Sequence, residues 1–295
     1  MIARIQRSVV LGWLLVFAAW TAYWWGRSTA VWIAGLLVLA LGHSAFLAVE
    51  FMTGQRVGAD DPAPRASVAQ IIRAWLAETW AAPRVFAWQQ PFRWHAEPDH
   101  LPAASTKRGV VLIHGLLCNR GFWNPWLQRL RAADRAFVAV DLEPVFGSIE
   151  RYVAIVEDAV QRVSAATGQP PVLICHSMGG LAARAWLRGA DGARVRRIVT
   201  IGTPHHGTWL ARFGRSVNGR EMRIGGEWIS RIESEPASVQ RVPFTCWYSN
   251  CDNIVFPPSV ATLGGADNRL APGLGHVEMA FDASLRDATL ALIDG

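Results

Sequence analysis

The densest hydrophobic pattern lies at the start of the chain. Residues 9–26 and residues 28–49 contain no Asp, Glu, Lys or Arg. Each run is close to the ~20 residues that an α-helix needs to cross the core of a bilayer. Because only Arg27 separates the two runs, we expect a tight turn between antiparallel helices. The pattern therefore predicts a transmembrane helical hairpin over residues 1–52.

Basic residues around the hairpin predict its orientation. Arg4 and Arg7 precede the first run, Arg56 and Arg65 follow the second, and the turn contains only Arg27. The positive-inside rule then places the N-terminus and the long C-terminal part in the cytoplasm. We expect a multi-pass protein of the bacterial inner membrane whose large C-terminal domain is cytoplasmic. A cleaved signal peptide followed by a core helix is the alternative.

The segment after the hairpin changes character twice. Residues 53–66 are rich in Gly, Pro and Asp and predict a linker. Residues 67–80 then carry apolar side chains at helical spacing, which predicts an amphipathic helix. Two positions remain open for this helix: on the membrane surface, or packed on the core of the domain that follows.

Short apolar runs alternate with helical patterns from residue 109 onward. Runs of this length, rich in β-branched residues, predict buried strands, and the helical patterns between them include residues 149–166 and 180–188. The alternation predicts a mostly parallel sheet with helices on both faces, within a domain that spans residues 67–295. The expected strands are Val110–Ile113, Ala136–Val140, Val172–Ile174, Ile198–Ile201 and Pro243–Tyr248.

The third of these runs ends in Cys-His-Ser-Met-Gly at residues 175–179, and a helical pattern follows at once. A strand, a serine on a tight turn and a helix are typical of a nucleophile elbow. The turn requires small residues two positions before and after the serine. Gly179 satisfies this requirement, and Cys175, which stands where glycine is usual, is small enough. We therefore predict that Ser177 is a nucleophile rather than an ordinary helix N-cap.

A serine nucleophile needs a base, an orienting acid and donors for the oxyanion. In this arrangement the chain order is serine, acid, histidine. Asp252 follows a predicted strand and His276 lies in a glycine-rich loop, so we expect them to be the acid and the base. The backbone N–H groups of Leu116, at the end of the first predicted strand, and of Met178, directly after the serine, are the expected oxyanion donors.

Several motifs in this order resemble those of bacterial lipases and esterases of the α/β-hydrolase family. The resemblance covers residues 109–278 and implies an α/β-hydrolase fold, preceded here by the hairpin, and ester hydrolysis through an acyl-enzyme. It also implies no catalytic role for His205 or His206, and a cap or lid near residues 209–238. The apolar and arginine side chains that interleave there suit a short cap over an acyl chain, in contact with lipid headgroups, and suit equally an ordinary solvated helix pair. The motifs are His114-Gly115, Cys175–Gly180, Gly202-Thr-Pro-His-His-Gly-Thr208, Tyr248-Ser-Asn-Cys-Asp-Asn-Ile-Val-Phe-Pro257 and Gly275-His276.

The distribution of charge argues against a nucleic-acid-binding protein, and the spacing of the cysteines argues against a zinc site. The net charge is +6, but the arginines are scattered without a basic block, so we expect a surface that faces anionic lipid and no nucleic-acid partner. The 4 cysteines show no zinc-binding spacing, and we expect reduced, buried thiols. A bridge between Cys246 and Cys251 would require an oxidising compartment. We expect neither a cofactor nor a metal, calcium included.

Together these patterns predict a membrane-anchored serine hydrolase of lipase or esterase type. The expected partners are the membrane and a lipid or other amphiphilic ester as substrate, and the oligomeric state has no signature in the sequence. A thioesterase or an acyltransferase would use the same triad. A non-catalytic membrane scaffold or transport component is the alternative from a different class of protein.

Overall fold

The computed structural model of the chain describes residues 1–103, 105–234 and 242–294. Its centre is a 6-stranded sheet in the order β2-β1-β3-β4-β5-β6, in which every pair of neighbouring strands is parallel. This confirms the predicted parallel sheet. The strands are β1 (Val110–Ile113), β2 (Phe137–Ala139), β3 (Val172–His176), β4 (Arg197–Ile201), β5 (Phe244–Tyr248) and β6 (Asp267–Leu270).

Strand β6 is not among the strands that the sequence predicts. Its residues Asp267-Asn-Arg-Leu270 are exposed or half-buried, and it pairs only with β5 at the edge of the sheet. An edge strand with polar side chains forms no apolar run, so periodicity does not reveal it.

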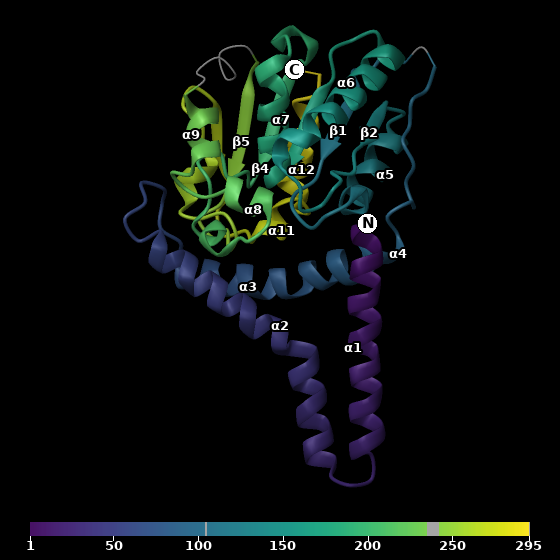
Figure 1. Cartoon of the computed structure of the whole chain (residues 1–295), viewed down its shortest axis with the longest axis vertical. Helices are drawn as coiled ribbons and strands as arrows, with labels where there is room; N and C mark the ends of the chain where they lie inside the picture. The colour runs from purple at the N-terminus through teal and green to yellow at the C-terminus, as the bar shows by residue number, and fades with distance from the viewer. Residues whose placement is uncertain (104, 235–241, 295) are drawn as a thin grey trace.

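Helices cover both faces of the sheet, as expected (Figure 1). The longer helices of the body are α5 (Asn124–Ala132), α6 (Val153–Thr167), α7 (Met178–Gly189) and α12 (Ala283–Ala291), and the shorter ones are α8 (Val217–Glu221), α9 (Glu227–Glu233) and α11 (His276–Met279). Short 3-10 segments are η2 (Arg120–Trp123), η3 (Ile149–Tyr152), η4 (Gly192–Arg194), η5 (Trp209–Phe213) and η6 (Pro258–Ala261).

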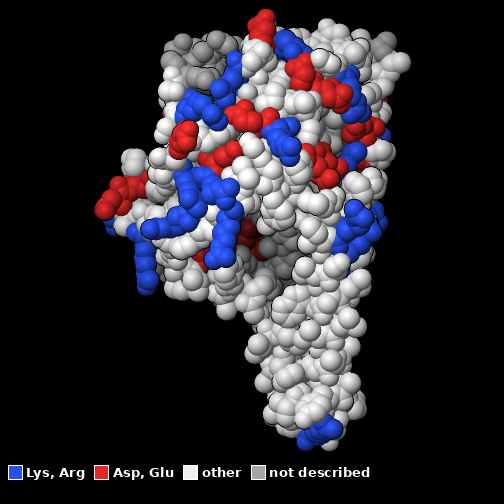
Figure 2. All heavy atoms as spheres, viewed as in Figure 1, with Lys and Arg blue, Asp and Glu red and all other residues white. Residues whose placement is uncertain are grey.

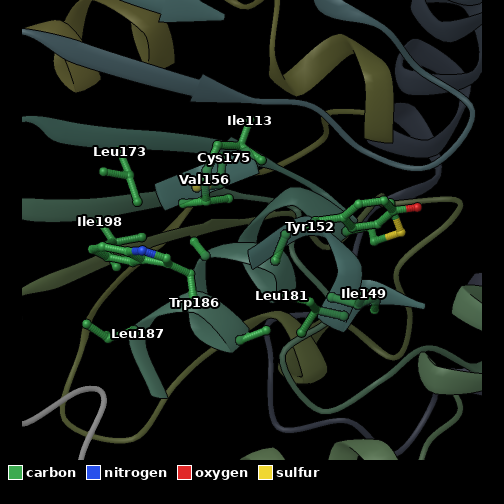
Figure 3. Close-up of a cluster of buried hydrophobic side chains, with 14 of the residues drawn as sticks. Ile113, Ile149, Tyr152, Val156, Leu173, Cys175, Leu181, Trp186, Leu187 and Ile198 are labelled. Atoms are coloured by element: carbon green, nitrogen blue, oxygen red, sulfur yellow. The ribbon is translucent and has the colours of Figure 1, made fainter. Parts of the chain in front are cut away.

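Alternate residues of each strand face two separate cores, because successive side chains point to opposite faces of a sheet. Val111 and Leu173 pack with α6 and α7 on one face, around the buried Trp186 (Figure 3). Val110 and Val172 pack on the other face, around Trp123 and Trp126 near α5. Burial on both faces explains why the strands read as continuous apolar runs.

The two N-terminal helices, α1 (Ile2–Trp24) and α2 (Thr29–Val57), are long and apolar enough to cross a membrane. Figure 1 shows α1 and the first half of α2 projecting from the body as a stalk, while the second half of α2 bends beneath the body. Helix α2 continues into residues 53–66, the segment predicted to be a linker. Packing holds it helical there: Phe51 is buried, and Gln55 donates a hydrogen bond to the Asn250 carbonyl.

Helix α3 (Val68–Pro83) lies across the base of the body and runs on through the π-helical segment η1 (Arg84–Gln89) into α4 (Gln90–Phe92). A capping box between Ser67 and Gln70 starts it. Its buried residues are Ala74, Glu78 and Thr79. A stripe of apolar residues at a spacing of four faces away from the body, so α3 packs on the core and also presents an apolar outer face. This stripe consists of Val68, Ile72, Leu76 and Trp80.

The predicted cap near residues 209–238 comprises η5, α8 and α9. Residues 235–238 of this prediction lie outside the described residues. The inner side chains of the segment, such as Ala211, Met222 and Ile229, are buried, whereas Phe213 and Ile224 are exposed.

Candidate active site

Ser177 stands on a strained turn between β3 and α7. Its backbone adopts φ 54° and ψ −129°, a left-handed φ that is uncommon for any residue other than glycine. Two hydrogen bonds fix the backbone of Ser177. Its N–H donates to the Ile201 carbonyl at 2.9 Å, and its carbonyl accepts the Thr203 hydroxyl at 2.8 Å. The strain is therefore maintained by contacts with β4 and the loop that follows it.

The residues around the turn leave no room for side chains. A Cβ atom on Gly179 would lie 2.4 Å from the Ile113 carbonyl oxygen, and one on Gly115 would lie 2.8 Å from the Cβ of Ser177. Cys175, where glycine was the usual residue, is fully buried in the core beside α7. Burial raises the pKa of its thiol, so Cys175 fills space in its neutral form.

Asp252 and His276 are in direct contact, although 24 positions separate them. The His276 Nδ1–H donates to Asp252 Oδ2 at 2.9 Å, and both side chains are almost fully buried. Asp252 Oδ1 accepts the backbone N–H groups of Ile254 at 2.9 Å and Val255 at 2.7 Å, which fixes the carboxylate. Because Nδ1 carries the proton, the neutral imidazole keeps its lone pair on Nε2.

The charge of His276 is set by two opposed effects. Burial lowers its pKa, but the neighbouring Asp252 carboxylate, with smaller contributions from Glu78 and Glu50, raises the pKa above the ordinary histidine value. Gly202 permits the close approach of the pair: its φ is +57°, and a Cβ there would lie 3.1 Å from Asp252 Oδ2. The pair is therefore built to stabilise an imidazolium ion.

The two amides expected to hold the oxyanion flank Ser177. Met178 is the first residue of α7, so its N–H has no carbonyl partner within the helix. Leu116 follows β1 and lines the same cavity as Ser177, and its N–H donates to no other group in the described part of the chain. Two uncommitted N–H groups near one hydroxyl suit an oxyanion hole.

The other histidines near the site are committed to structural contacts. His114 Nε2 accepts the Leu142 N–H at 3.1 Å and its Nδ1–H donates to the Gly115 carbonyl at 2.8 Å, while burial lowers its pKa. His176 donates from Nε2 to the His276 carbonyl at 3.1 Å and stacks on Phe122. His205 is buried beside Thr200 and away from the cavity lining, whereas His206 pairs with Glu233. The prediction that neither His205 nor His206 is the base stays a prediction, and these contacts give all four histidines a structural role.

A cavity of about 440 Å³ contains both Ser177 and His276 in its lining. Its walls are mainly apolar. Besides the segments that carry Ser177, Asn253 and His276, they come from the loop after β1, from residues 208–222, and from the N-terminal helices. The N-terminal helices contribute Phe46, Leu47 and Glu50 from α2 and Glu78 and Ala82 from α3.

Glu50 and Glu78, which also line this cavity, are not among the site residues that the sequence predicts. A signal was present: Glu50 directly follows the uncharged run 28–49, and Glu78 is the only acidic residue in the helix pattern of residues 67–80. Neither signal identifies the groups that these carboxylates contact, because the hydrogen-bond partners of Glu50 and Glu78 lie about 200 positions away in the chain.

Cys118 lies in the lining of this cavity. All 4 cysteines are free and buried. Within residues 1–103, 105–234 and 242–294, no group of three or more His, Cys, Asp or Glu side chains is arranged to hold a metal ion.

Comparisons with known proteins support the interpretation of the fold. A family model described as "Alpha/beta hydrolase family" matches residues 110–277. Among solved structures, the mature lipase BlEst2 of Bacillus licheniformis aligns with a TM-score of 0.58 and 16% identity, over 64% of this chain and 93% of that one. Lipase B of Aspergillus fumigatus aligns with a TM-score of 0.52 and 20% identity, over 63% of this chain and 53% of that one. The search of curated proteins found no significant match.

Glycine 179 provides a test of the turn geometry. We expect Gly179→Ala to lower the free energy of unfolding by about 1–3 kcal/mol, because the new methyl group collides with the backbone of β1. Gly189→Ala, at the other end of α7, is the matched control: a Cβ there meets nothing within 4 Å, so we expect a neutral or slightly stabilising effect. Denaturant unfolding in detergent measures both, and equal stabilities would contradict the crowded turn.

Proposed function

The chain belongs to the alpha/beta hydrolase family, and on that basis we propose that it is a serine hydrolase that cleaves carboxylic esters, of lipase or esterase type. The observation that carries this proposal is the arrangement around one cavity. Ser177 stands on a strained turn at the cavity wall, and His276, which lines the same cavity, donates to the buried carboxylate of Asp252. In this proposal Ser177 is the nucleophile, His276 the base and Asp252 the orienting acid.

The proposed reaction has two halves. Ser177 Oγ attacks the ester carbonyl carbon while His276 Nε2 accepts the hydroxyl proton, and the resulting imidazolium ion protonates the departing alcohol oxygen. Water then attacks the acyl-enzyme with His276 again as base, which releases the carboxylic acid and restores Ser177. The N–H groups of Leu116 and Met178 hold the oxyanion in both halves, and each such donor contributes about 3 kcal/mol of transition-state stabilisation.

The proposed substrate is a lipid or another amphiphilic ester. The cavity beside Ser177 is lined mainly by apolar side chains, including Leu210 and Met222 of the cap segment and Phe46 and Leu47 of α2. An apolar cavity with few polar groups suits an acyl chain. Because α2 is also a candidate membrane span, one wall of the cavity is formed by a helix that leads into the stalk.

We further propose that the stalk anchors the enzyme in a membrane. Figure 2 shows a stalk surface almost without charge, a basic group at its tip, and basic side chains gathered at the edge of the body where the stalk begins. The apolar windows of α1 and α2 are mostly exposed, which disfavours a buried core helix. In this proposal residues 1–52 form the hairpin and residues 67–295 the hydrolase domain, with residues 53–66 joining them.

We propose a bacterial inner-membrane protein, and the distribution of arginine supports a cytoplasmic position for its hydrolase domain. Arg4 and Arg7 lie at the body end of α1, and Arg56 lies at the body end of α2, whereas the turn at the tip has only Arg27. The apolar outer stripe of α3 lies at the same end and suits contact with the bilayer surface. The sequence contains no basic block of the kind that binds a nucleic acid.

Ser177→Ala tests the proposed nucleophile. We expect turnover of a short-chain activated ester by the full-length protein in detergent to fall by roughly a thousandfold or more, together with loss of labelling by a fluorophosphonate. Ser284→Ala, on the exposed side of α12, is the control and keeps both activities. Equal turnover by the Ser177→Ala variant and the wild type would refute the proposal, and wild-type protein that neither labels nor turns over would favour a non-catalytic scaffold. A panel of thioesters and alcohol acceptors separates a thioesterase or an acyltransferase from an esterase.

The protonation of His276 predicts the pH dependence. Only the neutral imidazole accepts the Ser177 proton, so kcat/KM rises with pH through the His276 pKa, which the Asp252 carboxylate raises above the ordinary histidine value of about 6.5. We expect the midpoint of the acid limb on the alkaline side of that value. A midpoint clearly on the acidic side would contradict the environment described for His276.

Cysteine labelling tests the orientation in the membrane. The native thiols are buried, so the background is low. We expect a membrane-impermeant maleimide to label Ser28→Cys, at the turn of the hairpin, from outside intact cells. Ser284→Cys, on the body, is expected to react only after the inner membrane is opened. The opposite labelling pattern would show that the orientation is the reverse of the proposed one. Labelling of both variants from outside intact cells would contradict a hairpin that spans the membrane.

A further inference from the structure

A carboxylate from α3 contacts the first turn of α11, the helix that begins at His276. Glu78 is 1% exposed, and its two oxygens accept the backbone N–H groups of Val277 and Glu278, each at 3.0 Å. The contact is close enough to require glycine directly before α11, since a Cβ on Gly275 would lie 2.7 Å from Glu78 Oε2. The residues on either side of His276 are therefore fitted to the Glu78 carboxylate.

A second carboxylate, from α2, reaches His276 indirectly, through Asn253 in the loop after β5. Glu50 Oε2 accepts a hydrogen bond from Asn253 Nδ2 at 2.9 Å, and Asn253 Oδ1 accepts the backbone N–H of His276 at 3.1 Å. Asn253 directly follows Asp252. The chain of contacts thus runs from α2 through the residue beside the acid to the backbone of the base.

Further contacts tie the N-terminal helices to the segment around His276. Arg73 of α3 donates to the Gly273 carbonyl at 2.7 Å and pairs with Glu278 at 2.8 Å. Burying a carboxylate is costly unless its hydrogen bonds are made, and within the described residues the hydrogen bonds of Glu78 go to the first turn of α11. A surface helix that merely covered the body would not need a buried acid at this point.

We propose that Glu78, and Glu50 acting through Asn253, are positioning residues that hold His276 in place, so that α2 and α3 complete the active site. This inference rests on the proposed function of Ser177, Asp252 and His276. It implies that the hairpin is more than an anchor: the helix that enters the membrane also sets the geometry of the base.

The electrostatic surroundings of His276 give this role a readout of its own. The charged and titratable groups that face it are Asp252, Glu50 and Glu78, together with the buried His176; Glu278, on its own helix, is paired with Arg73. Burial raises the pKa of Glu78 to about 7, so its charge changes near neutral pH. A negative charge near the imidazole favours the imidazolium form.

The test compares Glu78→Ala, Glu50→Ala and Glu50→Gln with the control Asp287→Asn, an exposed acid on α12. We expect both alanine variants to lower kcat about 10- to 100-fold, because a base that is not held in position is often outside the reactive geometry. We expect KM to change less than about threefold. Glu50→Gln keeps an oxygen for Asn253, so we expect it to retain most of kcat. It also removes a negative charge, so the acid limb of its kcat/KM profile moves to lower pH. The control matches the wild type in all three quantities.

Thermal unfolding in the same detergent identifies variants that fail to fold. If Glu78→Ala unfolds, the comparison of Glu50→Ala with Glu50→Gln decides the question. Alanine variants that fold and match the control in kcat, with no shift of the acid limb in Glu50→Gln, would overturn the inference. Failure of the proposed function is distinct from this result, because then the wild type itself shows no Ser177-dependent turnover.

Discussion

The hydrogen bond between His276 and Asp252 is the contact around which the site is organised. Both groups are buried, where a charge-assisted hydrogen bond is strong and an unpaired charge is costly. Asp252 can hold the imidazole only because its other oxygen is fixed by two backbone N–H groups. Gly202 must leave space beside the pair. The loops after β4, β5 and β6 are therefore constrained together rather than one by one.

The parallel sheet brings the chemistry to one edge. Strands β1, β3 and β5 end just before Gly115, Ser177 and the loop that contains Asp252, and the carboxyl ends of parallel strands lie on the same side of a sheet. Apolar cores on both faces hold these strands in register. This rigidity allows Ser177 to be kept at a positive φ, since the contacts that maintain the strain belong to the core around it.

Helix α2 belongs both to the apolar stalk and to the wall of the cavity. The first half of α2 has the composition of a membrane span, and its second half packs on the body through Phe51 and lines the cavity with Leu47 and Glu50. Helix α3 divides its faces in the same way, with Glu78 inside and an apolar stripe outside. One wall of the hydrophobic cavity is therefore formed by a helix that is apolar enough to cross a membrane.

Local patterns in the sequence determined much of this arrangement. The strand–serine–helix pattern around Ser177, the apolar runs of the buried strands and the two uncharged N-terminal runs each depend on neighbouring residues, so they can be recognised without a fold. Asp252 and His276 could be selected because chain order and loop composition narrow the choice. That they touch, however, is known only from the structure.

Contacts between distant segments decided the rest. Nothing near Glu78 in the chain indicates that its carboxylate accepts N–H groups 199 and 200 positions away. The same holds for Glu50, for the continuation of α2 beyond the predicted hairpin, and for the face of α3 that packs on the body. The polar edge strand β6 also needed the sheet to define it. In each case the free energy comes from burial and hydrogen bonds that exist only once the chain has folded, and no local periodicity encodes them.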